Sequence, residues 1–99
     1  MKQTNLQIDD FTLSIVIPAF NEKNTIRDVI NAVLATPFRK EIIVVDDGST
    51  DGTRDVVQNI NHPEIKTIFH EKNSGKGKSI QTGFNNATGD IILIQDADL

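Results

Sequence analysis

The sequence contains no cysteine. It can therefore form neither a disulfide framework nor a thiolate site, and this absence fits a reducing compartment, so we expect a cytoplasmic protein. No apolar run approaches the roughly 18 residues that a membrane span needs. The first residues, MKQTNLQIDD, also lack the apolar core of a signal peptide.

Basic residues are few and scattered. Ten Lys and Arg stand against 14 Asp and Glu, which gives a formal net charge of -4. Without a Lys/Arg stripe the chain lacks the phosphate contacts on which nucleic-acid binding depends, so we expect no nucleic-acid partner. The composition, 37% hydrophobic and 24% charged, is ordinary for a globular protein with one modest core.

Hydrophobic periodicity predicts strands alternating with helices. Short apolar runs typical of buried strands occupy residues 13–17, 42–45, 65–69 and 91–94. Helical spacing appears between them, first from Ile26 to Leu34, then around Val56, Val57 and Ile60, and last with Ile80, Phe84 and Ala87 on one side. We expect Asn24 and Asp51 to cap the first two helices.

This alternation is typical of an α/β domain with a parallel sheet. We predict a Rossmann-like, mainly parallel sheet of about four strands in the order 3-2-1-4, with helices on both faces. It would span residues 13–99, and residues 1–12 would be an N-terminal extension. In that order the winding reverses between the first and fourth strands, and open α/β sheets bind ligands at the carboxyl ends of strands beside such a point.

Acidic residues follow three of the predicted strands. Glu22 comes after the first, Asp46 and Asp47 after the second, and Asp96 and Asp98 after the fourth. Gathered at one edge of the sheet, these carboxylates would repel one another without a partner. Mg²⁺ or Mn²⁺ would relieve this repulsion, because hard cations prefer oxygen ligands and bridge carboxylates to substrate phosphates. The alternative is that each pair caps a helix or turn.

Two neighbouring features suggest other contacts. Asp47 begins a turn whose backbone N–H groups are unpaired, so its carboxylate could accept a hydrogen bond from a nucleobase or form an Asx-turn. The loop Asn73–Gly77 precedes a predicted helix, where it could approach a diphosphate or remain a loop with solvated lysines. It is not a P-loop, because Lys72 stands where that motif requires glycine. His62 and His70 show no ligand or base pattern.

Four segments, in this order and at these separations, resemble the family 2 glycosyltransferases, whose catalytic domain has the GT-A fold. They are SIVIPAFNE at 14–22, IVVDDGSTDGT at 43–53, NSGKG at 73–77 and DADL at 96–99. Together they extend over nearly everything after the first dozen residues. The last segment looks most like the branch of dolichyl-phosphate mannose synthase and bacterial polyprenyl-phosphate sugar transferases.

The resemblance implies roles for individual residues. It implies a nucleotide pocket formed by Pro18, Ala19, Asn21, Glu22, Asp46, Asp47, Gly75, Lys76, Gly77 and Asp96, and a metal site formed by Asp96 and Asp98. Mn²⁺ or Mg²⁺ would neutralise charge on the departing nucleoside diphosphate. The donor would be a UDP- or GDP-sugar, polyprenyl phosphate is a candidate acceptor, and the full-length protein would associate with the cytoplasmic face of a membrane.

The resemblance also implies that the acceptor half and the catalytic base lie beyond Leu99. We therefore expect the chain to be the donor-binding half of a larger enzyme, inactive alone, with its catalytic residue unknown. The alternative is a non-catalytic receiver-type signalling domain with an acidic Mg²⁺ pocket and a phosphorylated aspartate. Such a domain needs paired acids at the end of its first strand, whereas Asp46 and Asp47 end the second.

Overall fold

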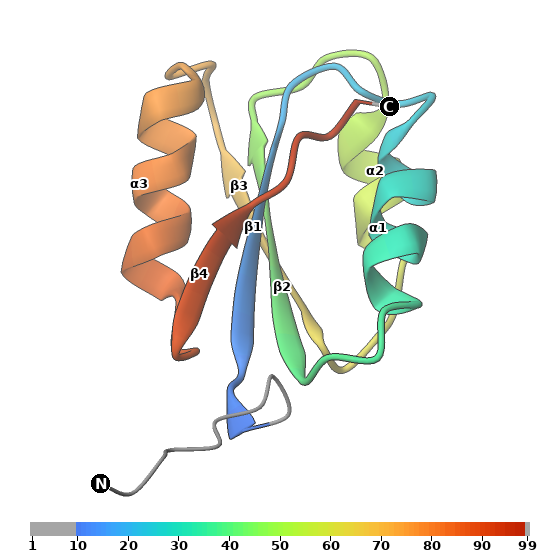
Figure 1. The fold of residues 1–99 in the computed structure, drawn as a ribbon. Helices are drawn as coiled ribbons and strands as arrows, with labels where there is room; N and C mark the ends of the chain where they lie inside the picture. The colour runs from blue at the N-terminus through green and yellow to red at the C-terminus, as the bar shows by residue number, and fades with distance from the viewer. Residues whose placement is uncertain (1–9, 99) are drawn as a thin grey trace, which may run out of the picture.

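The computed structural model describes residues 10–98, whose strands form a parallel sheet flanked by helices (Figure 1). The strands are β1 (Leu13–Ala19), β2 (Lys40–Asp47), β3 (Ile65–His70) and β4 (Ile91–Ile94), and the helices are α1 (Ile26–Leu34), α2 (Thr53–Gln58) and α3 (Lys76–Asn86). The order is β3-β2-β1-β4 and every pairing is parallel. Figure 1 places α1 and α2 on one face and α3 on the other. The predicted fold class, strand order and two-sided helix arrangement are confirmed. Most of the predicted extension 1–12 lies outside the described residues.

The main hydrophobic core lies between the sheet and the α1/α2 layer. Side chains of a strand alternate between its faces, so every second residue of β1 and β2 points into this core. Its buried members include Leu13, Ile15, Ile17, Ile42 and Val44 of the strands, Ile26, Val29 and Ile30 of α1, and Val57 of α2. Each such side chain contributes roughly 1.5–3 kcal/mol on burial, which makes this layer the main source of stability.

Helix α3 packs on the opposite face through small residues. Its buried positions are Ser79 and Gly83, and a Cβ atom at Gly83 would lie only 2.3 Å from Cγ1 of Val16. The prediction that Ile80, Phe84 and Ala87 form the apolar side of this helix is wrong, because Phe84 is 46% exposed and Ala87 follows the last helical residue. Glycine at position 83 lets the helix approach β1 closely, so contact with the sheet falls on Ser79 and Gly83 instead.

Three strands run further than their apolar residues indicate. β1 continues through Pro18 to Ala19, β2 includes Asp47, and β3 includes His70. β4 ends at Ile94, opposite Val16. Beyond that point β1 has one neighbour among the described residues, and proline is tolerated on such an edge. The longer β2 and β3 place Asp47 directly opposite His70 in the parallel register.

The predicted helix caps differ in outcome. Asn24 is not the cap of α1: Thr25 precedes the helix, and the Glu22 carbonyl accepts the Thr25 and Ile26 N–H groups. Before α2 the cap position is Gly52, with φ 103°, which suits glycine. Asp51, one position before the cap, nevertheless accepts the Thr53 N–H at 3.0 Å, so its side chain still bonds to the start of α2.

Strand β4 exposes its apolar side chains. Ile91, Ile92, Leu93 and Ile94 are 37–47% exposed. Within the described residues β4 pairs with β1 alone. The structure thus presents an unpaired apolar edge, a surface on which another strand can add. Among residues 10–98 no helix has the length and apolar character needed to cross a membrane.

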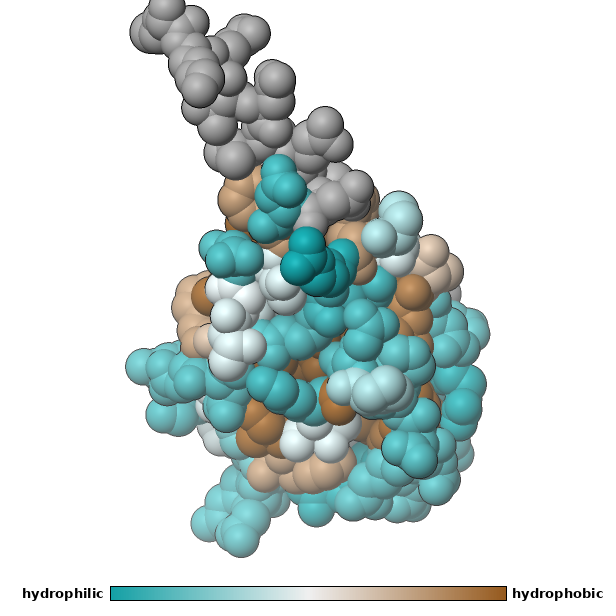
Figure 2. All heavy atoms as spheres, turned by 90° about the horizontal axis from the view of Figure 1, so that it is seen from below, coloured by the Kyte–Doolittle hydropathy of each residue, from teal (hydrophilic) through white to brown (hydrophobic). Residues whose placement is uncertain are grey.

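The end of the sheet where the strands begin is joined by one carboxylate. Oε2 of Glu41 accepts hydrogen bonds from the Ser14 hydroxyl, from the N–H and hydroxyl of Thr88, and from the Gly89 N–H, while Oε1 lies 2.9 Å from Lys66 Nζ. Figure 2 views this end, whose surface is mostly hydrophilic with hydrophobic side chains showing between. Glu41 therefore links three neighbouring strands far from their carboxyl ends.

We expect Glu41→Gln to destabilise the protein in a pH-dependent way. Burial raises the pKa of Glu41, but the hydrogen bonds from Lys66, Ser14 and Thr88 outweigh it and lower the pKa from 4.5 to about 2. A lowered folded-state pKa contributes stability that is complete above the unfolded value and lost as the pH falls from 4.5 towards 2. At pH 7 the substitution should reduce the free energy of unfolding by about 3 kcal/mol.

Urea unfolding at pH 7, 4 and 2.5 measures this effect. The difference between wild type and Glu41→Gln should shrink steadily towards the lowest pH. Glu71→Gln, at an exposed position, serves as the control and should change little. A difference of constant size across the pH range would show that the charge of Glu41 is not what stabilises the fold.

Candidate functional site

A cleft opens at the carboxyl ends of β1, β2 and β4, where the winding of the sheet reverses. It encloses about 420 Å³ and is lined by Pro18, Ala19, Phe20, Glu22, Asp47, Asn73, Gly75, Lys76, Ser79, Asp96, Ala97 and Asp98. Small-molecule sites range from roughly 300 to 1,000 Å³. The cleft therefore has the position and the size of a ligand site in an open α/β sheet.

The structure brings most of the predicted site residues to this cleft. Those that line it are Pro18, Ala19, Glu22, Asp47, Gly75, Lys76, Asp96 and Asp98. Asn21, Asp46 and Gly77 do not line it. Gly77 lies in the first turn of α3, and a Cβ atom there would meet nothing within 4 Å.

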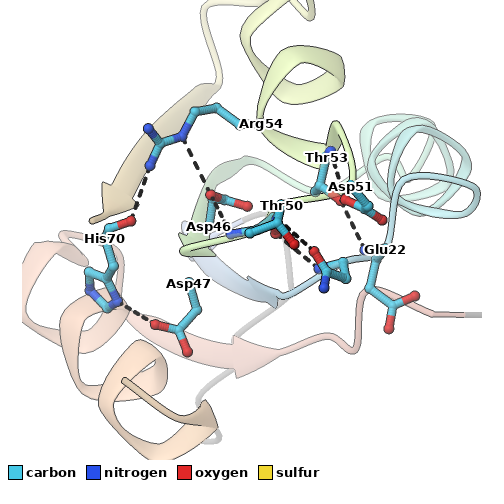
Figure 3. Close-up of polar contacts among 10 residues, drawn as sticks. Glu22, Asp46, Asp47, Thr50, Asp51, Thr53, Arg54 and His70 are labelled. Carbon is cyan, nitrogen blue, oxygen red and sulfur yellow. Dashed lines mark hydrogen bonds and ion pairs between the residues drawn. The ribbon is translucent and has the colours of Figure 1, made fainter. Parts of the chain in front are cut away.

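Asp46 is fully buried beneath the turn that follows β2. Its Oδ2 lies 3.6 Å from Nε of Arg54 and accepts a long hydrogen bond, 3.4 Å, from the Ser49 N–H. Arg54 in turn donates to the His70 carbonyl at 3.1 Å (Figure 3). Its guanidinium group also lies over the Phe69 ring. Asp46 therefore supports the turn from below.

Asn21 connects the ends of β1 and β2. Its N–H donates to the Ser49 hydroxyl at 2.9 Å, and its side-chain oxygen accepts the Thr50 N–H at 2.8 Å. Its φ of 53° lies in the left-handed region, which asparagine tolerates better than most residues. Asn21 holds the turn after β2 in place beside the cleft.

Asp47 holds the loop before α3. Its Oδ1 accepts the Ser74 N–H at 2.9 Å and lies 2.8 Å from Nδ1 of His70, and its Oδ2 accepts the Gly75 N–H at 2.9 Å. Burial raises the pKa of this carboxyl, but the bonds from His70, Ser74 and Gly75 outweigh burial and lower it. Asp47 is thus an ionised carboxylate with its oxygens directed at the loop.

His70 is a site residue that the sequence pattern did not reveal. Its Nδ1 contacts Asp47 (Figure 3). Its Nε2 lies 3.0 Å from the Thr82 hydroxyl, so one ring joins β2, β3 and α3. The only signal was the register, which pairs His70 with Asp47 one residue past the predicted strand. His70 does not itself line the cleft. The lining residues that were not among the predicted site residues are Phe20, Ser79, Ala97 and Asn73, the last of which begins the loop expected to approach a diphosphate.

Asp96 and Lys76 form an ion pair at the mouth of the cleft. Their atoms Oδ1 and Nζ are 2.7 Å apart, and both side chains are about 60% exposed (62% for Lys76, 61% for Asp96). The hydrogen bond that Lys76 donates to Asp96 raises the pKa of Lys76. Exposed pairs of this kind contribute little net free energy, so a cation or phosphate can replace either partner.

The segment that carries the aspartates is anchored to α1. Ala97 is buried, and its carbonyl accepts a 2.8 Å hydrogen bond from the Thr25 hydroxyl. Asp96 and Asp98 flank this buried residue and are both exposed. The anchor directs both carboxylates to the same cleft while leaving them in contact with solvent.

The donor set fits a hard cation that brings ligands of its own. In the part of the chain that the structure describes, no three Asp, Glu, His or Cys side chains are placed to enclose a metal ion. Mg²⁺ is commonly held by one or two carboxylates together with water and substrate phosphates. Asp96 and Asp98 could supply those carboxylates, with a phosphate completing the shell.

Comparisons with known proteins agree with this geometry. The family model described as "Glycosyl transferase family 2" matches residues 14–99. A dolichyl-phosphate beta-glucosyltransferase of Trichomonas vaginalis is 38% identical over 96 residues, which cover 86% of this chain and 28% of that protein.

Solved structures give the same answer for the fold. A Pyrobaculum calidifontis mannosyltransferase in complex with GDP-Man and Mn²⁺ superposes with a TM-score of 0.83 at 27% identity, covering 98% of this chain and 31% of that one. S. aureus TarS in complex with UDP gives 0.81 at 32% identity, covering 88% and 27%.

The chain spans less than a third of the length of these three proteins. The receiver-type alternative finds no support, because β1 ends in Ala19 and Asp47 is hydrogen-bonded to the loop before α3. The strand order, the acidic cleft and the match over residues 14–99 lead to one conclusion. This chain belongs to glycosyl transferase family 2.

Proposed function

We propose that this chain binds the nucleoside diphosphate of a sugar nucleotide together with Mn²⁺ or Mg²⁺, as the donor-binding part of a glycosyltransferase. The observation that carries the proposal is the convergence of Asp47, Lys76, Asp96 and Asp98 on one cleft from β2, α3 and the segment after β4. A buried, ionised carboxylate at one side suits a nucleobase. The exposed charges at the other side suit a diphosphate and its cation.

Each group would have a distinct task. Asp47 would accept a hydrogen bond from the base, and Pro18 and Ala19 would form the wall beside it. Asp96 and Asp98 would hold the cation, which supplies Lewis-acid stabilisation of the departing diphosphate when bound. Lys76, released from Asp96 by the cation, would be placed to contact a phosphate oxygen.

The acceptor and the whole protein belong to the same proposal. The Trichomonas relative is named for dolichyl phosphate, which supports polyprenyl phosphate as the acceptor class here. Association of the full-length protein with the cytoplasmic side of a membrane would follow from such an acceptor. Because Asp96 and Asp98 are assigned to the cation, the catalytic base would come from outside these 99 residues.

Thermal unfolding with nucleotide and metal tests the proposal. We expect UDP or GDP to raise the melting temperature by roughly 10–20 °C at a hundredfold excess over the dissociation constant, and only when Mn²⁺ or Mg²⁺ is present. Inorganic phosphate with Mn²⁺ and each nucleotide with EDTA are the controls. If no nucleoside diphosphate stabilises the protein, or if EDTA leaves the gain unchanged, the proposal is wrong.

A further inference from the structure

The carboxylate of Asp47 has little hydrogen-bonding capacity left. An ionised carboxylate offers about four acceptor positions. Three are occupied: Oδ1 bonds to His70 and Ser74, and Oδ2 bonds to Gly75. Asp47 lines the cleft, so the position that remains for a ligand is the second one on Oδ2.

The contact with Asp47 shows which ring nitrogen of His70 donates to the carboxylate. Since Asp47 is ionised and accepts only, the Nδ1 atom of His70 must carry the proton and donate to Oδ1. Nε2 lies 3.0 Å from the Thr82 hydroxyl, which can donate or accept, so this contact leaves the role of Nδ1 unchanged. The ring is only slightly exposed, with 16% of the side-chain surface accessible. His70 is therefore a fixed donor that keeps Oδ1 occupied.

We infer that His70 is a specificity-determining positioning residue, which leaves Asp47 one acceptor position and so selects a base with a single ring N–H, uracil or thymine. The inference rests on the proposed function and names its donor class. His70 would not contact the nucleotide. It would act by occupying the oxygen that a second base donor needs.

The nucleobases differ in the number of hydrogen-bond donors that they can present to Asp47. Guanine presents two adjacent donors, its ring N–H and its amino group, which match a carboxylate with both oxygens available. Cytosine and adenine present an unprotonated ring nitrogen in the middle of that edge, and an ionised carboxylate repels its lone pair. Uracil and thymine present one N–H between two carbonyl groups, which matches a single acceptor.

Asn73 supplies a complementary donor beside Asp47. Its Oδ1 accepts the Gly75 N–H at 3.1 Å, so the NH₂ end of this amide is the one available to a ligand. Asn73 lines the same cleft. The Asn73 amide would donate to a carbonyl oxygen of the base, while Asp47 accepts from the ring N–H beside it. Uracil and thymine have a carbonyl group on each side of their ring N–H.

Affinities of nucleoside diphosphates with Mn²⁺ test the inference by calorimetry. UDP and dTDP should bind at least about tenfold more tightly than GDP, CDP and ADP, the discrimination expected from one unpaired buried donor. Weaker binding of dTDP than UDP would show that the ribose hydroxyl is read in addition to the base, and equal binding that the base alone is read. GDP, CDP or ADP binding as tightly as UDP overturns the inference but leaves donor binding standing. No binding of any of the five defeats the proposed function itself.

Substitution of His70 separates a specificity role from a structural one. His70→Phe frees one acceptor position on Oδ1, which keeps its bond from the Ser74 N–H, so the preference for UDP over GDP should fall to less than about threefold. His70→Asn keeps a side-chain N–H near the position of Nδ1 and should restore the preference. His62→Phe changes the other histidine, which lies in the loop before β3, and should leave the preference unchanged.

The ratio of affinities is the readout that matters. A purely structural His70 would weaken UDP and GDP binding equally in His70→Phe, and a ratio equal to that of wild type would overturn the inference. If His70→Phe does not fold, His70→Asn and the wild-type ranking still decide. Thr82→Val adds a milder case, because it removes only the contact to Nε2 and should reduce the ratio partially.

Discussion

Asp98→Asn is expected to abolish the metal-dependent stabilisation by nucleoside diphosphates. The amide keeps the shape of the side chain but removes the negative charge that a hard cation needs. Loss of a direct ligand should weaken binding of the Mn²⁺–nucleotide complex by at least about 100-fold, since even indirect changes around metal sites cost 10–100-fold. Asp98 is exposed, so the melting temperature without ligand should stay close to that of wild type.

Two further variants serve as comparisons for the loss of metal-dependent stabilisation in Asp98→Asn. Asp28→Asn removes an exposed carboxylate from the first turn of α1, away from the cleft lining, and should retain the full response. Asp96→Asn should also lose the response and, in addition, release Lys76 from its ion pair. The measurement is the melting temperature with UDP across a Mn²⁺ titration. An unchanged metal response in Asp98→Asn would remove this residue from the metal site.

Gly48→Ala is expected to damage the fold and the cleft together. Gly48 has φ 74°, and a Cβ atom there would lie 2.6 Å from the Asn73 nitrogen and 2.7 Å from the Lys72 carbonyl carbon. Both are backbone atoms, so no side chain can rotate aside. Left-handed backbone strain and overpacking together should reduce the free energy of unfolding by roughly 3–5 kcal/mol.

The loss at Gly48 should reach ligand binding through the loop that it touches. A methyl group would push residues 72–73 away from β2, and the adjacent Ser74 and Gly75 N–H groups would leave Asp47. Gly75→Ala is the control for backbone strain without overpacking, because its φ of 95° and ψ of 156° are also unfavourable to alanine while its Cβ would meet nothing within 4 Å. We expect a loss of about 1–3 kcal/mol in the free energy of unfolding there. Urea unfolding compares the two, and equal losses would show that backbone strain alone, not the contact with the loop, makes Gly48 necessary.

The sequence by itself determined the elements, their order and the edge at which a site would form. Apolar runs of strand length alternating with helical spacing require a parallel sheet, and right-handed crossovers leave few orders for four strands. Parallel strands bring their carboxyl ends to one edge, so Asp47, Asp96 and Asp98 were expected to meet, and the structure places them around one cleft.

Tertiary structure alone decided which residues face the cleft and what surrounds them. Asp46 and Asp47 are adjacent on one strand, so they point to opposite faces, and only packing shows that Asp46 is buried near Arg54 while Asp47 reaches the loop before α3. His70 and Thr82 come from β3 and α3, and both meet beside Asp47 because Gly83 lets α3 approach β1. Hydrophobic periodicity predicts which side chains are buried, but it does not predict which residues of other elements they contact. Those contacts determine the charge and the hydrogen-bonding capacity of the site.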